Sequence, residues 1–389
     1  MKKGVKKQLI TRIFMIIIFL LGCLTALYPF YSDAINGILD QRMIEKFERE
    51  RAIQEAERRE QMLEENERIA KNGASPGADP FGGESGKKNT TQSYLEKHMI
   101  GTLTIPKINA QMPIFDTTND RLLDRGATVL QGTSYPTGGP STHSVLTAHR
   151  GLPQRQLFTD LPKLQKEDLF VLEILGEKLA YEVNQIKTVE PNQTEDLRIF
   201  EGEDLVTLVT CTPYMINSHR LLVRGHRVPY TEEIAKASEA AKEKREWMQW
   251  LILAGMILLI LFLLYLLYRS LQIYRLRKKV FDLTFYLRDA HDRPLSGITM
   301  ELLDRKGKLP KQRNGRKMQA TSDGQGKIIF EKLPGNLYMV KLLGNSTVPA
   351  FRIGLTKPKQ TELQVFLPKN AEIEQIKQDQ QIILRKKAD

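Results

Sequence analysis

The sequence predicts a mainly β protein with two membrane-spanning helices. Residues 95–230 and 280–368 consist of short runs rich in β-branched residues that end at Gly, Pro, Asn or Asp. Residues 13–30 and 248–268 carry no charged side chain and are long enough to cross a bilayer. With 389 residues, 41% of them hydrophobic, the chain has room for two or three domains.

The first apolar run, residues 13–30, follows a basic N-terminus of residues 1–12. A secretory signal peptide has the same order of a basic and then an apolar region. No small-residue cleavage site of the A-x-A kind follows, however, so the sequence favours an uncleaved transmembrane anchor.

The net charge of +12 is unevenly distributed along the chain. Residues 13–268 contain 28 Lys and Arg against 34 Asp and Glu, whereas residues 1–12 and 269–389 together contain 30 against 12. Basic residues therefore flank both spans on the same side, which by the positive-inside rule is the cytoplasm. We expect a cell-membrane protein with two spans, both termini cytoplasmic and residues 31–247 outside. The basic excess indicates orientation in a lipid bilayer, and we expect no nucleic acid partner.

Two segments lie between the first span and the β-rich region. Residues 31–71 are rich in Glu, Arg and Gln with apolar residues at helical spacing, which predicts a mostly solvated extracytoplasmic helix. A partner-binding coiled coil is the alternative. Residues 72–94 are dense in Gly, Ser, Asn and Pro, typical of a linker. Phe81 is unusual in a linker, so a functional loop stays open.

The β-rich region, residues 95–230, favours a closed or sandwiched all-β domain, because it has many short strand-like runs without a strong helical pattern. Those runs include IGTLTIPKI, HSVLTAH, LAYEVNQI and DLVTLVTC. Residues 231–247 are a helical linker into the second span. Beyond that span we expect a basic flank (269–279), a small β-sandwich (280–368) and a polar tail, frayed or helical (369–389).

The chain has only two cysteines. Cys23 lies in the first span and Cys211 in the extracytoplasmic β region, so a disulfide between them is not expected and Cys211 is a free thiol. A lone cysteine is most often a small buried apolar residue. Use as a nucleophile requires a thiolate, a proton-transferring partner and a group that stabilises the oxyanion.

Candidates for these roles are present. His149 ends an apolar run in VLTAHRG, and Arg220 begins the strand after Cys211, joined to it by the short connection PYMINSH. Neighbouring strands would bring Cys211 and Arg220 together. We expect neither a metal nor a cofactor. The other histidines that could compete with His149 are His143, His219 and His226, each of which could equally be a surface residue.

With these residues the chain resembles the sortase family, the cysteine transpeptidases that join surface proteins on Gram-positive bacteria. The family pattern is a His ending one strand, a TLxTC cysteine ending a later one, and an Arg opening the next; TAHRG, TLVTC and HRLLVRG match it. The resemblance covers residues 95–230 and implies a sortase-type closed β-barrel. It also implies that Cys211 is the nucleophile, His149 the acid and base, and Arg220 the group that binds substrate and the oxyanion.

The chain further resembles class C, the pilin-polymerising sortases. Members have two spans, a cytoplasmic C-terminus and an N-terminal lid with an Asp-Pro-aromatic motif, matched here by DPF at residues 79–81. This implies that Asp79 pairs with Arg220 and that Phe81 covers the pocket of Cys211. The implied partners are pilin subunits with LPxTG-like sorting signals, cleaved between Thr and Gly, and an acceptor lysine of another pilin.

Other functions remain as alternatives. A sortase that anchors proteins to peptidoglycan is the nearest, followed by a hydrolytic cysteine peptidase and a non-enzymatic membrane scaffold.

The C-terminal segment resembles a Cna-B-like β-sandwich. Many such modules carry an internal Lys–Asn isopeptide bond catalysed by a buried acid. Leu287 and Leu342 stand where that Lys and that acid are expected, so the sequence argues against the crosslink.

Overall fold

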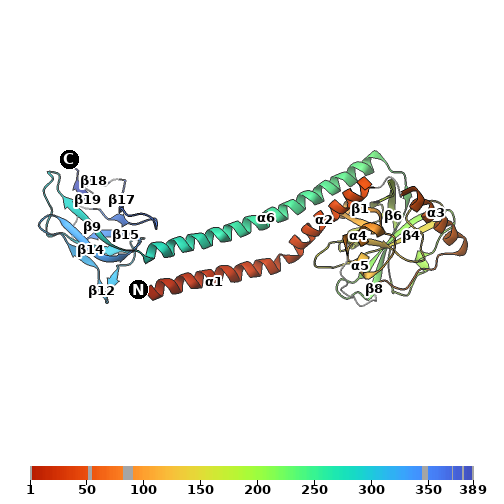
Figure 1. Cartoon of the computed structure of the whole chain (residues 1–389), viewed down its shortest axis with the longest axis horizontal. Helices are drawn as coiled ribbons and strands as arrows, with labels where there is room; N and C mark the ends of the chain where they lie inside the picture. The colour runs from red at the N-terminus through yellow and green to blue at the C-terminus, as the bar shows by residue number, and fades with distance from the viewer. Residues whose placement is uncertain are drawn as a thin grey trace. The chain divides into compact units, whose positions relative to one another are not determined.

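The computed structural model divides the chain into two units, each with its own hydrophobic core. One unit comprises Cys23–Leu258, and the other comprises Met1–Gly22 with Leu259–Asp389 (Figure 1). The structure describes residues 2–50, 55–81, 91–343, 349–369, 371–378 and 381–387.

The unit Cys23–Leu258 contains a closed β-barrel of eight strands in the order β1-β2-β3-β4-β7-β8-β6-β5. This confirms the predicted barrel. The strands are β1 (Met99–Ile105), β2 (Ala110–Phe115), β3 (Ala127–Val129), β4 (Thr142–Thr147), β5 (Leu169–Ile174), β6 (Glu177–Val189), β7 (Asp204–Thr212) and β8 (His219–Val228). Short helices join them: η2 (Pro106–Ile108), α5 (Asp120–Leu123), η3 (Leu161–Lys163) and η4 (Glu195–Leu197).

Strand β7 is almost wholly buried because both of its faces are covered. Side chains alternate along a strand, so Val206 and Leu208 point into the barrel core. Val209 lies on the opposite face, in a second cluster with Leu222 of β8. By the same alternation, Cys211 belongs to the face of Val209.

Helices α2 (Tyr28–Glu50) and α3 (Glu55–Asn72) cover the described part of the helix predicted over residues 31–71, and residues 51–54 lie outside the described residues. The helices are also less solvated than predicted. Met43 and Ile44 of α2 are buried in a cluster with barrel residues, and Asn66 of α3 donates to the Tyr135 carbonyl at 3.0 Å. These few buried positions are outnumbered by charged residues, which is why the composition indicated a solvated surface.

The helix of the first span, α1 (Lys2–Ala26), ends before the predicted boundary at residue 30. Pro29 is tolerated only in the first turn of a helix, and it stands in the first turn of α2. Residues 72–94 are not all linker, because α4 (Gln92–His98) begins within them, capped by the Thr91 side chain.

Helix α6 (Glu232–Lys278) is continuous over 47 residues, about 70 Å at the helical rise per residue. It unites the predicted helical linker, second span and basic flank. Both α1 and α6 contain apolar windows long enough to cross a membrane.

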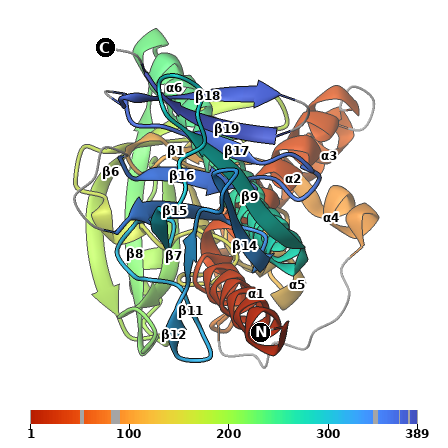
Figure 2. The same ribbon diagram turned by 90° about the vertical axis from the view of Figure 1, so that its left-hand side faces the viewer.

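The second unit ends in two sheets around one apolar core, as the sequence predicted (Figure 2). One sheet has the strand order β13-β10-β15-β16-β17 and the other β14-β9-β19-β18, with a separate β11-β12 hairpin. The strands are β9 (Val280–Arg288), β10 (Thr299–Leu303), β11 (Gln312–Arg313), β12 (Arg316–Lys317), β13 (Gln319–Thr321), β14 (Lys327–Pro334), β15 (Leu337–Leu342), β16 (Phe351–Gly354), β17 (Gln364–Phe366), β18 (Ile373–Gln378) and β19 (Gln381–Lys386).

The polar tail predicted for residues 369–389 is wrong. Strands β18 and β19 lie there, and β19 pairs in parallel with β9. The segment is polar on average, yet Ile373, Ile382 and Leu384 are buried in the sandwich core. Average polarity hid an alternating strand pattern.

The sandwich follows α6 with no linker, since α6 ends at Lys278 and β9 begins at Val280. The Gly335 amide donates to the Lys279 carbonyl at 2.8 Å. A Cβ on Gly335 would stand 2.1 Å from the Leu276 carbonyl oxygen, so only glycine lets this turn meet the helix end. The helix terminus and the sandwich are therefore joined by direct packing.

His143 is fully buried in β4, which corrects the alternative that it lies on the surface. Its Nδ1 lies 2.6 Å from the Arg198 carbonyl and its Nε2 lies 2.7 Å from the Thr207 hydroxyl. Burial lowers the pKa of His143 to about 4. The ring is therefore a neutral structural group between β4 and β7.

We expect His143 to make the barrel acid-sensitive. The imidazole has a pKa of about 6.5 when unfolded, so the unfolded chain binds a proton that the folded barrel excludes as the pH falls from 6.5 towards 4. Stability is then lost with falling pH, by about 2 kcal/mol between pH 7 and pH 5. Amide hydrogen exchange of β4 and β7 measures this loss of stability. The His143→Gln variant should lack this loss of stability between pH 7 and pH 5. As a control, His219→Gln at an exposed position should lose as much stability as the unchanged protein. If His143→Gln also loses the same stability, the assignment to His143 is contradicted.

Candidate active site

The pairing of β7 with β8 brings Cys211 and Arg220 together. The strands are antiparallel, and Cys211 lies directly opposite Arg220 in the ladder. As whole residues, Cys211 is 5% exposed and Arg220 is 7% exposed, so both are largely withdrawn from water. The predicted return of the chain to the same edge is present in this structure.

His149 reaches the site from β4, which pairs in parallel with β7. Beyond the end of β4, the Ala148 amide still donates to the Val209 carbonyl at 3.2 Å. The Thr210 hydroxyl donates to the Ala148 carbonyl at 2.7 Å. These bonds tie the residue before His149 to the two residues before Cys211, which fixes both backbones at one rim.

The DPF segment (residues 73–81) lies over this rim. The Arg220 guanidinium donates through Nε to Asp79 Oδ1 at 2.8 Å and through its terminal nitrogen to Oδ2 at 2.5 Å. The Arg220 side chain is 9% exposed and that of Asp79 is 23% exposed. A bidentate pair of this geometry is directional and partly shielded from solvent. The pairing implied by the resemblance is therefore present.

Phe81 lies between the other two groups. Its ring centroid is 5.7 Å from that of His149, edge to face, and 5.1 Å from the Arg220 guanidinium carbon. Phe81 also packs on the cluster that contains Val209 and Leu222, the face to which Cys211 belongs. One ring thus contacts both predicted partners of the cysteine.

The backbone of the DPF segment is held at its start. The Ser75 amide donates to the Gly132 carbonyl at 3.1 Å, and the Gly77 amide donates to the Gln131 carbonyl at 2.8 Å. Gly132 has φ +79° and a Cβ there would stand 1.9 Å from the Ser75 oxygen. A side chain at Gly132 would push the segment away, so this glycine permits the close approach.

The site as it stands disfavours charge on Cys211. Burial raises the pKa of the Cys211 thiol, and the nearby Asp79 carboxylate adds to the rise; Arg220 and Arg150 oppose it. Burial lowers the pKa of His149, against the opposite effect of Asp124, whose Oδ1 lies 3.6 Å from His149 Nε2. With the DPF segment in this position, a neutral thiol and a neutral imidazole are favoured.

Three residues beside the site were not singled out from the sequence. Arg150 donates to the Thr212 hydroxyl at 3.2 Å and lies 5.7 Å from the Tyr214 ring centroid. Thr210 bonds to the residue before His149, and Asp124 Oδ1 lies 3.6 Å from His149 Nε2. Arg150 and Thr210 sit inside TAHRG and TLVTC, so adjacency to the motifs was an available signal, whereas Asp124 is brought near only by the fold.

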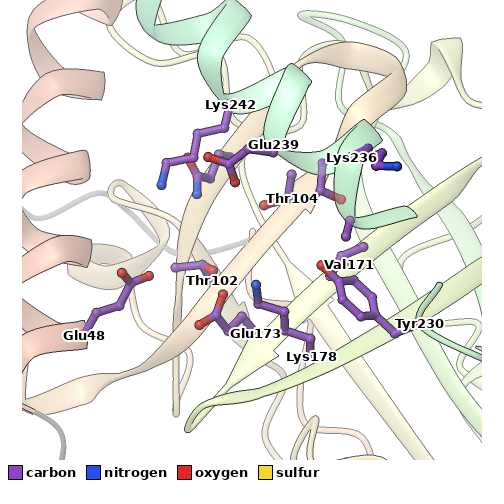
Figure 3. Close-up of a pocket in the computed structure, with 13 residues that line it drawn as sticks. Glu48, Thr102, Thr104, Val171, Glu173, Lys178, Tyr230, Lys236, Glu239 and Lys242 are labelled. Atoms are coloured by element: carbon purple, nitrogen blue, oxygen red, sulfur yellow. The ribbon is translucent and has the colours of Figure 1, made fainter. Parts of the chain in front are cut away.

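A cavity of about 360 Å³ on the outside of the barrel is a separate feature (Figure 3). It lies between α2, the start of α6 and strands β1, β5 and β6, and contains none of the five predicted site residues. Its charged side chains are Lys178, Lys236, Lys242, Glu48, Glu173 and Glu239. Equal numbers of each sign give no charge preference for a ligand. In the described part of the chain, no group of three or more His, Cys, Asp or Glu is arranged to hold a metal.

Comparison with known proteins agrees with this geometry. The sequence model of the sortase domain matches residues 103–228. Sortase A of Bacillus anthracis is 27% identical over 136 residues, which cover 35% of this chain and 63% of that protein, just under two thirds of its length. The crystal structure of Streptococcus agalactiae sortase C1 is 48% identical, with a TM-score of 0.41, and the match covers 46% of this chain and 92% of that one. The crystal structure of Streptococcus pneumoniae sortase C-1 is 40% identical, with a TM-score of 0.43, and the match covers 49% of this chain and 100% of that one.

The chain belongs to the sortase family; sequence identity over nearly the whole length of these solved relatives carries that assignment. Both are named as sortase C proteins, which supports the predicted class C. The likeness of the C-terminal sandwich to a Cna-B-like module stays a prediction.

We expect Asp79 and Phe81 to limit Cys211 in separable ways. In a Cys23→Ser background, Asp79→Asn should shift the pH profile of Cys211 alkylation to lower pH, because the carboxylate that raises the thiol pKa is gone and Arg220 is released. Phe81→Ala should raise the alkylation rate at all pH values by exposing the thiol. The double variant should leave the melting temperature of the barrel nearly unchanged.

A matched control is the pair Asp196→Asn with Phe200→Ala. Asp196 pairs with Lys187, and the exposed Phe200 ring lies 5.6 Å from the Arg224 guanidinium carbon. These changes should leave Cys211 reactivity unaltered. Unchanged reactivity in the Asp79 and Phe81 variants would mean that the segment is a linker, and a large loss of barrel stability would mean that it is a structural plug.

Proposed function

We propose that this chain is a membrane-anchored class C sortase that cleaves an LPxTG-like sorting signal between Thr and Gly and joins the acyl product to a pilin lysine. The observation that carries the proposal is the pairing of Cys211 with Arg220 at a rim shared with His149 and covered by the DPF segment. The sortase C proteins that are 40–48% identical to this chain support the subclass.

In the first half-reaction, Cys211 Sγ attacks the Thr carbonyl carbon while its proton passes to His149. The tetrahedral oxyanion forms next to Arg220, whose fixed charge stabilises it. The C–N bond to Gly then breaks, and His149 returns the proton to the leaving amine. The product is a thioacyl-enzyme.

In the second half-reaction, the acceptor amine attacks the thioester. His149 takes a proton from that amine, the new amide bond forms, and Cys211 leaves and is reprotonated. An acceptor lysine on a second pilin yields an isopeptide-linked polymer. Streptococcus pneumoniae sortase C, 42% identical, is described in connection with pilin substrate specificity, which supports this class of acceptor.

The DPF segment must leave before either step. Asp79 accepts the guanidinium N–H groups of Arg220 that would otherwise bind the oxyanion, and Phe81 fills the space between Arg220 and His149. One ring burial and one charge pair at a partly exposed rim are worth on the order of 1–4 kcal/mol. The entropy of ordering the loop opposes these two contacts, so we expect open states of the segment to be appreciably populated.

Replacement of the nucleophile tests the assignment. Cys211→Ala should abolish high-molecular-weight pilin ladders in cells with no other sortase, because no thioacyl intermediate forms. Cys23→Ser is the matched control and should keep them. Ladders that persist in Cys211→Ala would disprove the function.

Acceptor dependence separates the remaining candidates. A pilin-polymerising sortase forms more product when a pilin lysine is supplied, whereas a peptidoglycan-anchoring sortase requires the wall precursor. A hydrolytic peptidase releases acid regardless of acceptor, and a scaffold gives no adduct between a sorting-signal analogue and Cys211.

Membrane topology is a further part of the proposal. The apolar windows of α1 and α6 and the positive charge beside both support two spans, with the barrel outside and both termini in the cytoplasm. Protease added to intact protoplasts should therefore remove the barrel and spare residues 269–389, as followed by antibodies to each part. Digestion of both at the same rate would mean that α6 does not cross.

A further inference from the structure

Helices α1 and α6 are drawn side by side in Figure 1. A groove lies between them within the unit formed by Met1–Gly22 and Leu259–Asp389. Its volume is about 670 Å³. Most of its wall is apolar, and two arginines stand among the lining residues. The lining includes Arg12, Phe19, Phe262, Leu263, Leu266 and Arg269.

We propose that this groove binds an anionic phospholipid, with an acyl chain along the apolar wall and the phosphate between Arg12 and Arg269. The inference rests on the proposed membrane placement of the two helices. It does not depend on the reaction at Cys211.

The wall is suited to an acyl chain. Leu263 is 5% exposed and forms a floor between the helices, while Phe19 and Phe262 are each 56% exposed at the sides. Two helices that packed tightly along this length would have closed the space with these side chains. In hydrocarbon, a lipid chain fills such a space by dispersion contacts.

The cationic end lacks a protein partner. Residues 1–32 and 247–281 contain no Asp or Glu, and the ion pairs of the described residues include none to Arg12 or Arg269. Arg277 extends the cationic end in an adjoining small cleft and donates to the Gln8 side chain at 2.9 Å. Arg12 and Arg269 directly flank the two predicted spans, at the level of the lipid headgroups, where a basic side chain attracts the phosphate of an anionic lipid.

A phosphate headgroup is the anion that fits. Guanidinium groups bind phosphate oxygens through paired N–H donors. The arginines lie at the basic ends of the two helices, which the positive-inside rule puts in the cytoplasmic leaflet, where anionic lipids are abundant. The helix of another membrane protein would fit the apolar wall but would leave both charges unpaired unless it carried an acidic residue at that depth.

Photolabelling of the full chain tests the proposal. The protein is reconstituted in phosphatidylcholine vesicles containing a trace of phosphatidylglycerol with a photoactivatable group in its acyl chain. We expect label on α1 and α6 peptides of the groove, displaced by unlabelled phosphatidylglycerol but not by added phosphatidylcholine. Arg12→Gln with Arg269→Gln should lower labelling roughly tenfold.

Matched variants separate the groove from general charge and bulk. Lys7→Gln with Arg275→Gln removes the same charge from residues that do not line the groove, and should keep the label. Leu266→Trp fills the groove and should exclude the chain. Leu264→Trp adds the same ring at a 54% exposed position outside the groove and should leave the labelling unchanged.

The outcomes are distinct. The lipid site is disproved if phosphatidylcholine displaces the label as well as phosphatidylglycerol does, or if both pairs of charge variants lose the same amount of label, while the protein stays integrated in the membrane. Crosslinked dimers through α1 and α6 in place of lipid adducts would make the groove an interface between copies. Extraction of the protein by alkaline carbonate would overturn the membrane placement itself. Loss of Cys211 reactivity towards a sorting peptide, with labelling intact, would count against the proposed function alone.

Discussion

The arrangement of the active site depends on the antiparallel register of β7 and β8. Side chains alternate between faces, so a slip of one residue would turn Cys211 and Arg220 away from the face where the DPF segment lies. The hydrophobic pattern prevents this slip: Val206 and Leu208 must face the barrel core, and Val209 with Leu222 must face the second cluster. The packing of the barrel thereby selects the direction of the reactive side chains.

The electrostatics of the site follow from one shared cation. Arg220 can serve either the Asp79 carboxylate or negative charge near Cys211, and in this structure Asp79 holds it. While the Asp79 carboxylate is paired with the guanidinium of Arg220, the same carboxylate also raises the pKa of the Cys211 thiol. A ligand that displaces Asp79 both frees the cation and removes a charge that opposes thiolate formation, so occupancy and activation of the site change together.

The sequence predicted the barrel, the sandwich and the site residues because each depends on local signals. Strand-like runs predicted an all-β domain and the sandwich, whereas the closed barrel was implied by the resemblance to sortases. The TLVTC, TAHRG and DPF motifs carried that resemblance, and the roles it implies for their residues stay predictions. What it missed depends on tertiary contacts or on averages. The burial of His143 requires partners 55 and 64 residues away in sequence. The break at Pro29 and the pairing of β18 with β19 were hidden by the mean composition of the surrounding residues.

The junction at Gly335 has a mechanical meaning. Since no flexible residues separate Lys278 from Val280 and the turn of the sandwich packs on the last carbonyls of α6, the helix end and the module turn as one body. Rotation of this end of α6 about its axis would swing the sandwich through the same angle. A protein bound to the sandwich would then fix the direction in which this end of α6 presents its arginines and its apolar side chains. The orientation of the sandwich would therefore set the rotation of this end of α6 about its axis.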